Sequence, residues 1–575
     1  MAQFNKKGLK ITASFLNACA ACLLVLVAAF FYYFVYQNAI NVPYFDDFAY
    51  LRYVLNFQKT PSVLEFLRLL EEKHNGHGVI TAKLVFWLNG LIEGQINFRT
   101  LTIIGSGLVL ILFNYFRKIL NTNKIDFFYL FPVGLLLFTP AYHENIFWAA
   151  ALWQYTASFA VGIATYYALA QPSRWTLAMA ALLGFLMTYT NGNGLFGMYI
   201  GAVIPLLQGR YKRLGGWLLA CVLTTIVFYW YYPFGFGSLA EARTLRGSFL
   251  TIVSFFGAAG HYLRGGLLEV AITGASVVLS LFGGLGFLTV LFLGQFFKRQ
   301  KNGTILVIFT RSPANLSLLA LLAWLAITGL GVAVARASNS LESPARYMIY
   351  SVVTLAALYV AALLILPARL QKWLAFGMTG FGTVFVVGTY LFAAPNVINF
   401  RNSLAADAYS LRQHRRVSGK VETMTNINTL KTFEDAVATG LYVIPPTQLD
   451  GIETLPAVSS SVLRFSIQRD TMPVYGGILR YKIKNEDFLF DQSQPRNGLY
   501  VLLKNQLTNK IYCNAPQQNP NRGRGNFLRT GHYFAKGFEA TFYEDNLPPG
   551  TYQIGLFFCE NGKRRVVYSR QKIEI

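Results

Sequence analysis

Residues 11–36 read ITASFLNACAACLLVLVAAFFYYFVY, and residues 43–48, a few positions later, read PYFDDF. An apolar run of this length is sufficient for a helix that crosses a bilayer. Lys6, Lys7 and Lys10 precede it, as in a signal peptide, but the run is too long and has no small-residue cleavage site. We expect it to remain as the first membrane helix, with the N-terminus in the cytoplasm.

The composition identifies a polytopic membrane protein. The 575 residues are 54% hydrophobic and 15% aromatic, with a mean hydropathy of +0.40. These values exceed those of ordinary soluble proteins. The net charge of +24 could suggest nucleic acid, but Lys and Arg in a membrane chain mainly set its orientation. We therefore expect membrane lipids and no nucleic acid as partners.

Apolar runs of spanning length recur up to about residue 394 and predict a helical bundle of about eleven spans. Residues 249–266 are too short for this count and are interpreted as a re-entrant or interfacial helix. The turns on the expected cytoplasmic side contain Lys and Arg but no Asp or Glu, in agreement with positive-inside topology. These turns are residues 117–124, 171–174, 208–213, 298–311 and 367–372.

The chain changes character after the last span. Residues 396–419 predict a basic connector near lipid headgroups, with Arg401, Arg412, Arg415 and Arg416. Residues 420–575 predict an extracytoplasmic β-sandwich. Its clearest strands are residues 462–467, 478–483, 499–503 and 551–558, and the turn LPPG at 547–550 precedes the last of them. Cys513 and Cys559 in this domain are disulfide candidates.

Asp46 and Asp47 are the first candidates for chemistry, because charge is unfavourable at a membrane boundary and usually has a function there. The alternative is that one of them only begins a helix, since Asp is a good helix cap.

The long first outer loop, residues 38–99, adds further polar residues. Its segments 63–70 and 79–91 predict amphipathic helices on the membrane surface. Between them lies EEKHNGHG, with Glu71, His74 and His77, and the next outer turn contains His143 and Glu144. Together with the Asp pair, these side chains are candidates for a Zn, Mn or Mg site. Hydrogen bonds to sugar hydroxyls or to a headgroup are the alternative.

Two arginines at the outer ends of consecutive spans, Arg336 and Arg346, go against the inside bias of positive charge. Arginine forms bidentate bonds to phosphate, so both are candidates for a phosphate site, together with Tyr347. Snorkelling to the headgroups is the alternative. Arg243, Arg246 and Arg264 are weaker candidates on the same side.

The order of these motifs resembles the GT-C superfamily of membrane glycosyltransferases, and most closely a bacterial group within it. The matching phrases are YFDDF at 44–48, HNGH at 74–77, ENIFW at 144–148, NGNGL at 191–195 and the segment 336–347. The resemblance covers about residues 1–395. Gly78, where an arginine is expected, and Ala149–Ala151, in place of a more polar continuation, depart from it.

The resemblance implies transfer of a sugar from a polyprenyl-phosphate donor to a glycan or glycolipid acceptor outside the bacterial inner membrane. Asp46 or Asp47 is expected to take the proton of the acceptor hydroxyl, and Arg336 and Arg346 to stabilise the leaving phosphate. Inversion at the anomeric carbon is expected by analogy. Substrate contacts are expected from Glu71, His74, His77, His143, Glu144 and Asn193.

Three other functions fit the same features. A lipid or glycan transporter or flippase would have charges near the membrane midplane and repeated halves, which the sequence does not display. A ligase or polymerase would use lipid-diphosphate donors at the same face. A scaffold that presents the terminal domain is the third alternative.

Overall fold

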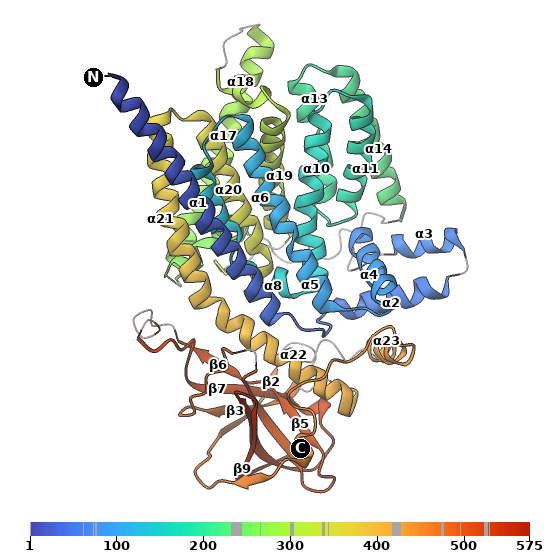
Figure 1. The fold of residues 1–575 in the computed structure, drawn as a ribbon. Helices are drawn as coiled ribbons and strands as arrows, with labels where there is room; N and C mark the ends of the chain where they lie inside the picture. Colours follow the sequence, from blue (N-terminus) through green and yellow to red (C-terminus); the bar gives the residue numbers. More distant parts are fainter. Residues whose placement is uncertain are drawn as a thin grey trace.

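The computed structural model describes residues 2–575 apart from 61, 73, 75–77, 232–243, 265, 299–303, 336–339, 343, 417–426, 473–476, 495, 522–526 and 528. The described chain is mainly helical and ends in a region of β-sheets (Figure 1). The first helix, α1 (Ala2–Asn38), lies along one side of the bundle, and its C-terminal end points toward the sheets (Figure 1).

Seven helices among the described residues are long and apolar enough to cross a membrane, as expected for a membrane protein. A bent pair, residues 127–147 and 149–170, would make eight if it forms one span. The seven comprise α1, α5–α6 (Phe98–Ser106, Leu108–Thr122), α14 (Tyr211–Tyr231), α17 (Leu267–Lys298), α19 (Pro313–Ala335), α20 (Met348–Ile365) and α21–α22 (Ala368–Phe392, Ala394–His414).

Shorter apolar helices complete the bundle. The bent pair includes α7 (Phe131–Leu137), α8 (His143–Phe147), α9 (Ala149–Ala151) and α10 (Ala157–Ala170), and the chain bends by 118° between its two halves. Beside α10 stand α11 (Arg174–Thr188), α12 (Gly194–Ile200) and α13 (Val203–Leu207), and α18 (Thr304–Thr310) precedes α19. The predicted total of about eleven spans stays a prediction.

Residues 249–266 form α15 (Leu245–Gly257), a 3-10 turn and α16 (His261–Arg264). The segment lies against α17, α19 and α20, and Ser351 on α20 donates a hydrogen bond of 2.6 Å to the carbonyl of Phe256. Residues 253–260 are all buried within the protein. The interpretation as a re-entrant or interfacial helix stays a prediction.

The long loop at residues 38–99 contains the two predicted helices, α3 (Val63–Glu71) and α4 (Ile80–Glu93), after α2 (Asp47–Lys59). Each leaves large apolar side chains exposed, such as Val63 at 77% and Ile92 at 82%, which suits a membrane surface. On the other side, α2 and α4 share a core with α23 (Ile427–Ala438). Residues 427–444 therefore pack with this loop.

The C-terminal region consists of two sheets. One has the order β1-β9-β8-β4-β5 and the other β2-β3-β7-β6. Side chains from both sheets, including Ile483, Phe542, Leu503 and Leu556, form one buried core. The strands are β1 (Ala457–Ser459), β2 (Ser466–Met472), β3 (Ile478–Asn485), β4 (Gly498–Asn505), β5 (Ile511–Asn514), β6 (Gln517–Pro520), β7 (Phe534–Tyr543), β8 (Thr551–Glu560) and β9 (Lys563–Glu574).

Three of the four predicted strands are confirmed. Segments 478–483, 499–503 and 551–558 lie within β3, β4 and β8, whereas 462–467 overlaps β2 only from residue 466.

Residues 396–414 of the predicted basic connector form α22, which continues almost directly from α21, and the connector role stays a prediction. Arg401 is 6% exposed and donates to the backbone oxygen of Gln492 at 3.1 Å. Arg412 forms an ion pair with Asp450. These guanidinium groups attach α22 to the sheet region, so they are not available to headgroups.

The predicted disulfide between Cys513 and Cys559 is also wrong. Both thiols are free and buried. Cys513 on β5 pairs with Leu502, whereas Cys559 on β8 pairs with Gly498, so β4 separates the two cysteines. Two strand spacings amount to about 9.5 Å, beyond the Cα separation of a disulfide.

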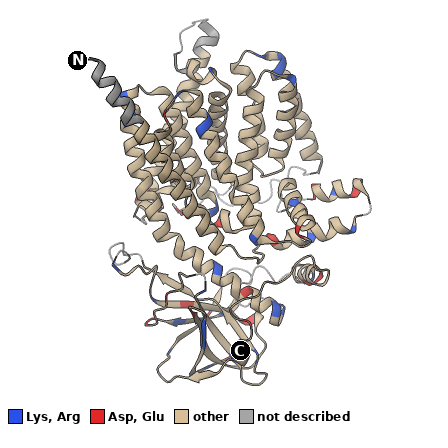
Figure 2. Cartoon of the chain, viewed as in Figure 1, with Lys and Arg blue, Asp and Glu red and all other residues tan. Residues whose placement is uncertain are grey.

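Charged residues are sparse within the helical bundle and gather at its ends and on the sheets (Figure 2). In this view the acidic residues lie at the end of the bundle that faces the sheets, in the loop helices and on the sheets themselves (Figure 2). In this view the acidic side chains are therefore concentrated at and beyond the end of the bundle nearest the sheets (Figure 2).

Candidate functional site

The PYFDDF segment forms a tight turn that begins α2. The N–H of Asp47 donates to the carbonyl of Tyr44 at 3.0 Å, and Phe45 has φ of +44°, which a bulky residue rarely adopts. The turn packs on Trp148, whose ring centroid lies 5.5 Å from that of Tyr44 and 5.8 Å from that of Phe45. Strain of this kind requires support from its surroundings and often marks functional positions.

Asp47 is a structural residue. Its side chain is buried, and its two oxygens accept hydrogen bonds from the N–H groups of Ala150 at 2.8 Å and Tyr44 at 3.0 Å. Burial raises the pKa of the Asp47 carboxyl well above its usual range, although both hydrogen bonds oppose this shift. The carboxyl therefore joins the loop at residues 38–99 to the segment that carries Ala150, and no face of it is open to a substrate.

Asp46 differs in its surroundings. It occupies the N-cap position of α2 without a side-chain capping bond, so the capping alternative does not account for its carboxylate. Its Oδ1 lies 3.3 Å from Nε2 of His74, and the Asp46 side chain is 30% exposed while that of His74 is 9% exposed. His74 Nδ1 in turn lies 3.5 Å from the Tyr53 hydroxyl. An accessible carboxylate is thus held by a buried imidazole.

Lys83 fixes the segment that carries His74. From α4, its Nζ donates to the carbonyls of Leu69 at 2.9 Å, Leu70 at 3.2 Å and Glu72 at 2.6 Å, and lies 3.9 Å from the centre of the Tyr53 ring. Burial lowers the pKa of Lys83 to about 7. The lysine therefore holds the C-terminal end of α3, two residues before His74.

Glu144 and Arg346 form a second charged pair. Glu144 Oε2 accepts a 3.0 Å hydrogen bond from the backbone N–H of Arg346 and lies 3.8 Å from its Nη1. The two side chains are 37% and 29% exposed. The guanidinium also lies over the ring of Tyr347, 5.5 Å from its centre. Arg346 is thus held at the start of α20 with part of its guanidinium open to solvent.

A cavity of about 340 Å³ lies beside this pair. Glu144 and His143 line it from α8, Tyr44 from the strained turn, and Gln517 from β6 of the sheet region. Asn396, Phe400 and Ser403 on α22 and Trp148 complete the wall. Asp46 is not part of the wall, but it follows Tyr44 by two residues. Tyr44 and Trp148, whose rings are in contact, line the cavity together with Glu144, whereas His74 and Arg346 do not.

The remaining predicted site residues differ in placement. Asn193 donates to Thr328 Oγ1 at 3.1 Å and to the Tyr350 hydroxyl at 3.3 Å, within the bundle. Glu71 is the last residue of α3, and Arg246 is exposed on α15. His77, Arg336 and Arg243 lie outside the described residues, and so does the side chain of Arg264.

A metal site stays a prediction. Within the described ranges, no group of three or more His, Cys, Asp or Glu side chains is arranged to hold a metal ion. Asp46 and His74 are the two predicted ligands that the fold brings into contact.

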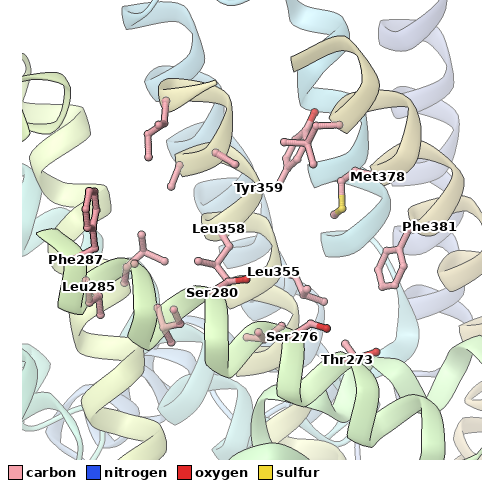
Figure 3. Close-up of a pocket in the computed structure, with 18 of the residues that line it drawn as sticks. Thr273, Ser276, Ser280, Leu285, Phe287, Leu355, Leu358, Tyr359, Met378 and Phe381 are labelled. Carbon is pink, nitrogen blue, oxygen red and sulfur yellow. The ribbon is translucent and has the colours of Figure 1, made fainter. Parts of the chain in front are cut away.

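A large apolar groove runs between α17, α20 and α21 (Figure 3). Its volume is about 780 Å³, and in Figure 3 its walls include Leu355, Leu358 and Phe381 opposite the hydroxyl side chains Ser276 and Ser280 of α17.

One end of the groove lies near the second charged pair. Leu263 lines the groove, and the preceding Tyr262 donates a 3.0 Å hydrogen bond to the carbonyl of Ala141, two residues before His143. The groove therefore approaches the turn that carries Glu144.

Comparison with known proteins identifies no relative: no family model, no curated protein and no solved structure matches the chain. The site is therefore interpreted from its own geometry.

Sequence reasoning missed several residues of this site. Lys83 occurs in an otherwise apolar helical stretch, which is a detectable signal of a buried, bonded cation. Gln517 and Ser403 have no such signal, because their relevance depends on how α22 and β6 pack against the bundle.

Proposed function

We propose that this chain is an inverting membrane glycosyltransferase. It moves a sugar from a polyprenyl-phosphate donor to a hydroxyl of a glycan or glycolipid acceptor on the extracytoplasmic face. The observation that carries the proposal is Asp46: a partly exposed carboxylate, 3.3 Å from a buried histidine, at the polar end of an apolar bundle.

Asp46 acts as the general base. Its carboxylate accepts the proton of the acceptor hydroxyl while the hydroxyl oxygen bonds to the anomeric carbon and the bond from that carbon to the phosphate oxygen breaks. A positioned base of this kind contributes about 10²–10⁴-fold to the rate. His74 holds the carboxylate in place, and one displacement inverts the anomeric carbon.

Arg346 stabilises the negative charge that develops on the leaving polyprenyl phosphate. The Glu144 carboxylate lies 3.8 Å from Nη1 of this guanidinium, and the guanidinium lies over the Tyr347 ring. Arg336 is proposed as its partner in phosphate binding, as the sequence predicts. Glu71, His77, His143, Glu144 and Asn193 are proposed to contact the sugar or the acceptor.

The apolar groove holds the polyprenyl chain of the donor. Its volume and its aliphatic and aromatic walls suit a flexible hydrocarbon. Its proximity to the turn before His143 supports a lipid chain in the groove with its phosphate at Arg346.

The proposed topology follows the positive-inside rule. The bundle has about eleven spans in the bacterial inner membrane, the N-terminus is cytoplasmic, and the two sheets form a periplasmic or extracellular β-sandwich. The buried Asp, His, Lys and Arg side chains of the described residues support a transferase over a transporter, because they lie in the first loop, near the start of α14 and in the part of α22 that packs against the sheets: Asp47, His74, Lys83, Arg213, Arg401 and Asp407.

The test compares surface glycans by mass spectrometry in cells that express the wild type, Asp46→Asn, or no copy of the gene. Glu65→Gln is the matched control, because Glu65 is an exposed carboxylate of the same loop. We expect Asp46→Asn and the deletion to lack the same single sugar, and Glu65→Gln to match the wild type.

Unchanged glycans in the Asp46→Asn strain, with the protein present in the membrane, would contradict the proposal. Loss of whole glycan chains in the deletion would favour a ligase, polymerase or flippase.

A further inference from the structure

A second polar cleft lies on the other side of α22. Residues 396, 400 and 403 of this helix line the cavity beside Glu144, whereas residues 401, 402 and 405 line a cleft of about 400 Å³. The spacing places the two sets on different faces of one helix. The opposite wall of the cleft comes from the sheet region and from the segment that precedes it, including Gln448 and Arg564.

The cleft is strongly basic. Arg401, Arg496 and Arg564 line it, and no Asp or Glu does. Over the described part of the chain, none of the three guanidinium groups forms an ion pair with a carboxylate. Like charges that share a cleft repel each other, and an oxyanion between them would remove this repulsion.

The neighbouring carboxylate of Asp450 does not neutralise the cleft. It pairs with Arg412 and accepts hydrogen bonds from the N–H and the hydroxyl of Thr447, both at 3.1 Å. Only the backbone carbonyl of Asp450 accepts a bond from Arg564. The positive charge of the cleft therefore stays uncompensated.

The charge of Arg401 is fixed in place. Its side chain is 6% exposed and donates to neutral oxygens only, among them Asn38 Oδ1 at 3.3 Å and Asn402 Oδ1 at 3.2 Å. Neutral acceptors satisfy its N–H groups without cancelling its charge. Arg401 therefore provides a permanent positive potential beneath the cleft.

Two buried polar atoms at the cleft have no hydrogen-bond partner among the described residues: the Nε of Arg564, a donor, and the Oε1 of Gln448, an acceptor. A saccharide satisfies both kinds of atom, because its acidic group accepts and its hydroxyls donate. The wall has few apolar side chains, Ile40 being the largest, so it offers no path for a lipid tail.

We propose that this cleft binds an anionic saccharide. Arg496 and Arg564 hold its carboxylate or phosphate group, and Gln448 accepts a hydrogen bond from one of its hydroxyls. This site goes beyond the proposed transfer reaction, and its occupancy is measurable without any transfer. If both proposals hold, the sheet region selects acidic acceptors.

The test is a binding titration on the full-length protein in phosphatidylcholine nanodiscs. The probes are an oligogalacturonate, glucose 1-phosphate, a neutral glucose oligomer and inorganic phosphate. We expect the acidic saccharides to bind, with an affinity that falls as salt increases, and the neutral oligomer not to bind. Arg564→Gln and Arg496→Gln should each weaken binding about tenfold or more.

Arg565→Gln is the matched control, because Arg565 is the exposed neighbour of Arg564 on β9 and does not line the cleft. It should bind as the wild type does. Thermal unfolding of each variant verifies that the fold is intact, and Gln448→Leu provides a charge-neutral variant that should also weaken binding.

Three results would overturn the proposal. They are equal binding of neutral and acidic saccharides, equal weakening by Arg565→Gln, and inorganic phosphate binding as tightly as the acidic saccharides. Loss of acidic saccharide binding when the nanodiscs contain phosphatidylglycerol would identify a lipid headgroup as the occupant and would also overturn it. Failure of Asp46→Asn to affect glycans bears only on the transfer reaction.

Discussion

Asp46 and Asp47 are adjacent in the sequence, but the Asp46 side chain is partly exposed and the Asp47 side chain is buried. The sequence predicts a functional carboxylate at this position but cannot distinguish the two residues, because the distinction depends on partners far along the chain. Ala150 supplies a backbone N–H to Asp47 across 103 positions, and His74 meets Asp46 from the end of another helix. Buried Asp47 therefore links the start of α2 to the segment that carries Ala150, whereas Asp46 is the proposed general base.

Lys83 provides a prediction at the same scale. Its pKa in the folded chain is about 7, below the ordinary value of 10.5, so between these pH values the unfolded chain binds more protons. The free energy of unfolding therefore rises with pH across this window, by at most about 1.4 kcal/mol per pH unit. We expect the Lys83→Met variant to lack this part of the rise.

The measurement is thermal unfolding of the purified wild type and of Lys83→Met at several pH values within the window. The melting temperature of the wild type should increase relative to that of the variant as the pH rises. Parallel pH profiles for the two proteins would contradict the assignment.

At the scale of elements, α3 and α4 were predictable from their apolar periodicity, but the contact of their loop with the end of α11 was not. Gly78 explains part of this docking. A Cβ atom at residue 78 would lie 2.6 Å from Cδ1 of Tyr189, at the end of α11, so the chain requires glycine there. Thr81 and Thr190 add a hydroxyl contact of 2.7 Å beside it.

We therefore expect Gly78→Ala to displace the first loop and to destabilise the protein by about 1–3 kcal/mol, because two packed segments must separate. Gly215→Ala is the control, since a Cβ there meets no atom within 4 Å. Limited proteolysis of the loop and melting temperature are the measurements. Equal protease resistance of both variants and the wild type would contradict the expectation.

The helix α22 illustrates an element that the sequence did not identify. Four arginines after the last apolar run suggested contact with headgroups. Two of them instead bond to partners 38 and 91 positions away, Asp450 and the carbonyl of Gln492. A local charge pattern does not distinguish arginines on a basic surface from arginines that bond to distant segments. The helix and its attachment to the sheet region were therefore found only in the structure.

At the scale of the whole molecule, the groove between α17, α20 and α21 provides a prediction. Ser280 points into the groove, so Ser280→Trp should fill it and displace part of the donor chain (Figure 3). Since each buried methylene contributes about 0.8 kcal/mol, loss of two or three such contacts should raise the donor KM by about tenfold or more. The kcat should change little.

Leu279→Trp is the matched control, because Leu279 is 74% exposed and does not line the groove. A donor with a short lipid chain should show a smaller difference between the two variants. If the two variants have the same donor KM, the groove does not hold the lipid.

The general organisation of the molecule, apolar helices followed by strands, was predictable because each span and each main strand has a local pattern. The cavity beside Glu144 was not, because Tyr44, Glu144, Phe400 and Gln517 come from four distant parts of the chain. Its existence depends on α22 placing the sheets beneath the bundle (Figure 1).

The most direct test of the central claim is the rate of sugar transfer by purified Asp46→Asn from a labelled polyprenyl-phosphate sugar. The account predicts a rate about 10²–10⁴-fold below that of the wild type and of Glu65→Gln, with unchanged melting temperature and donor binding. A rate for Asp46→Asn equal to that of the wild type would contradict it.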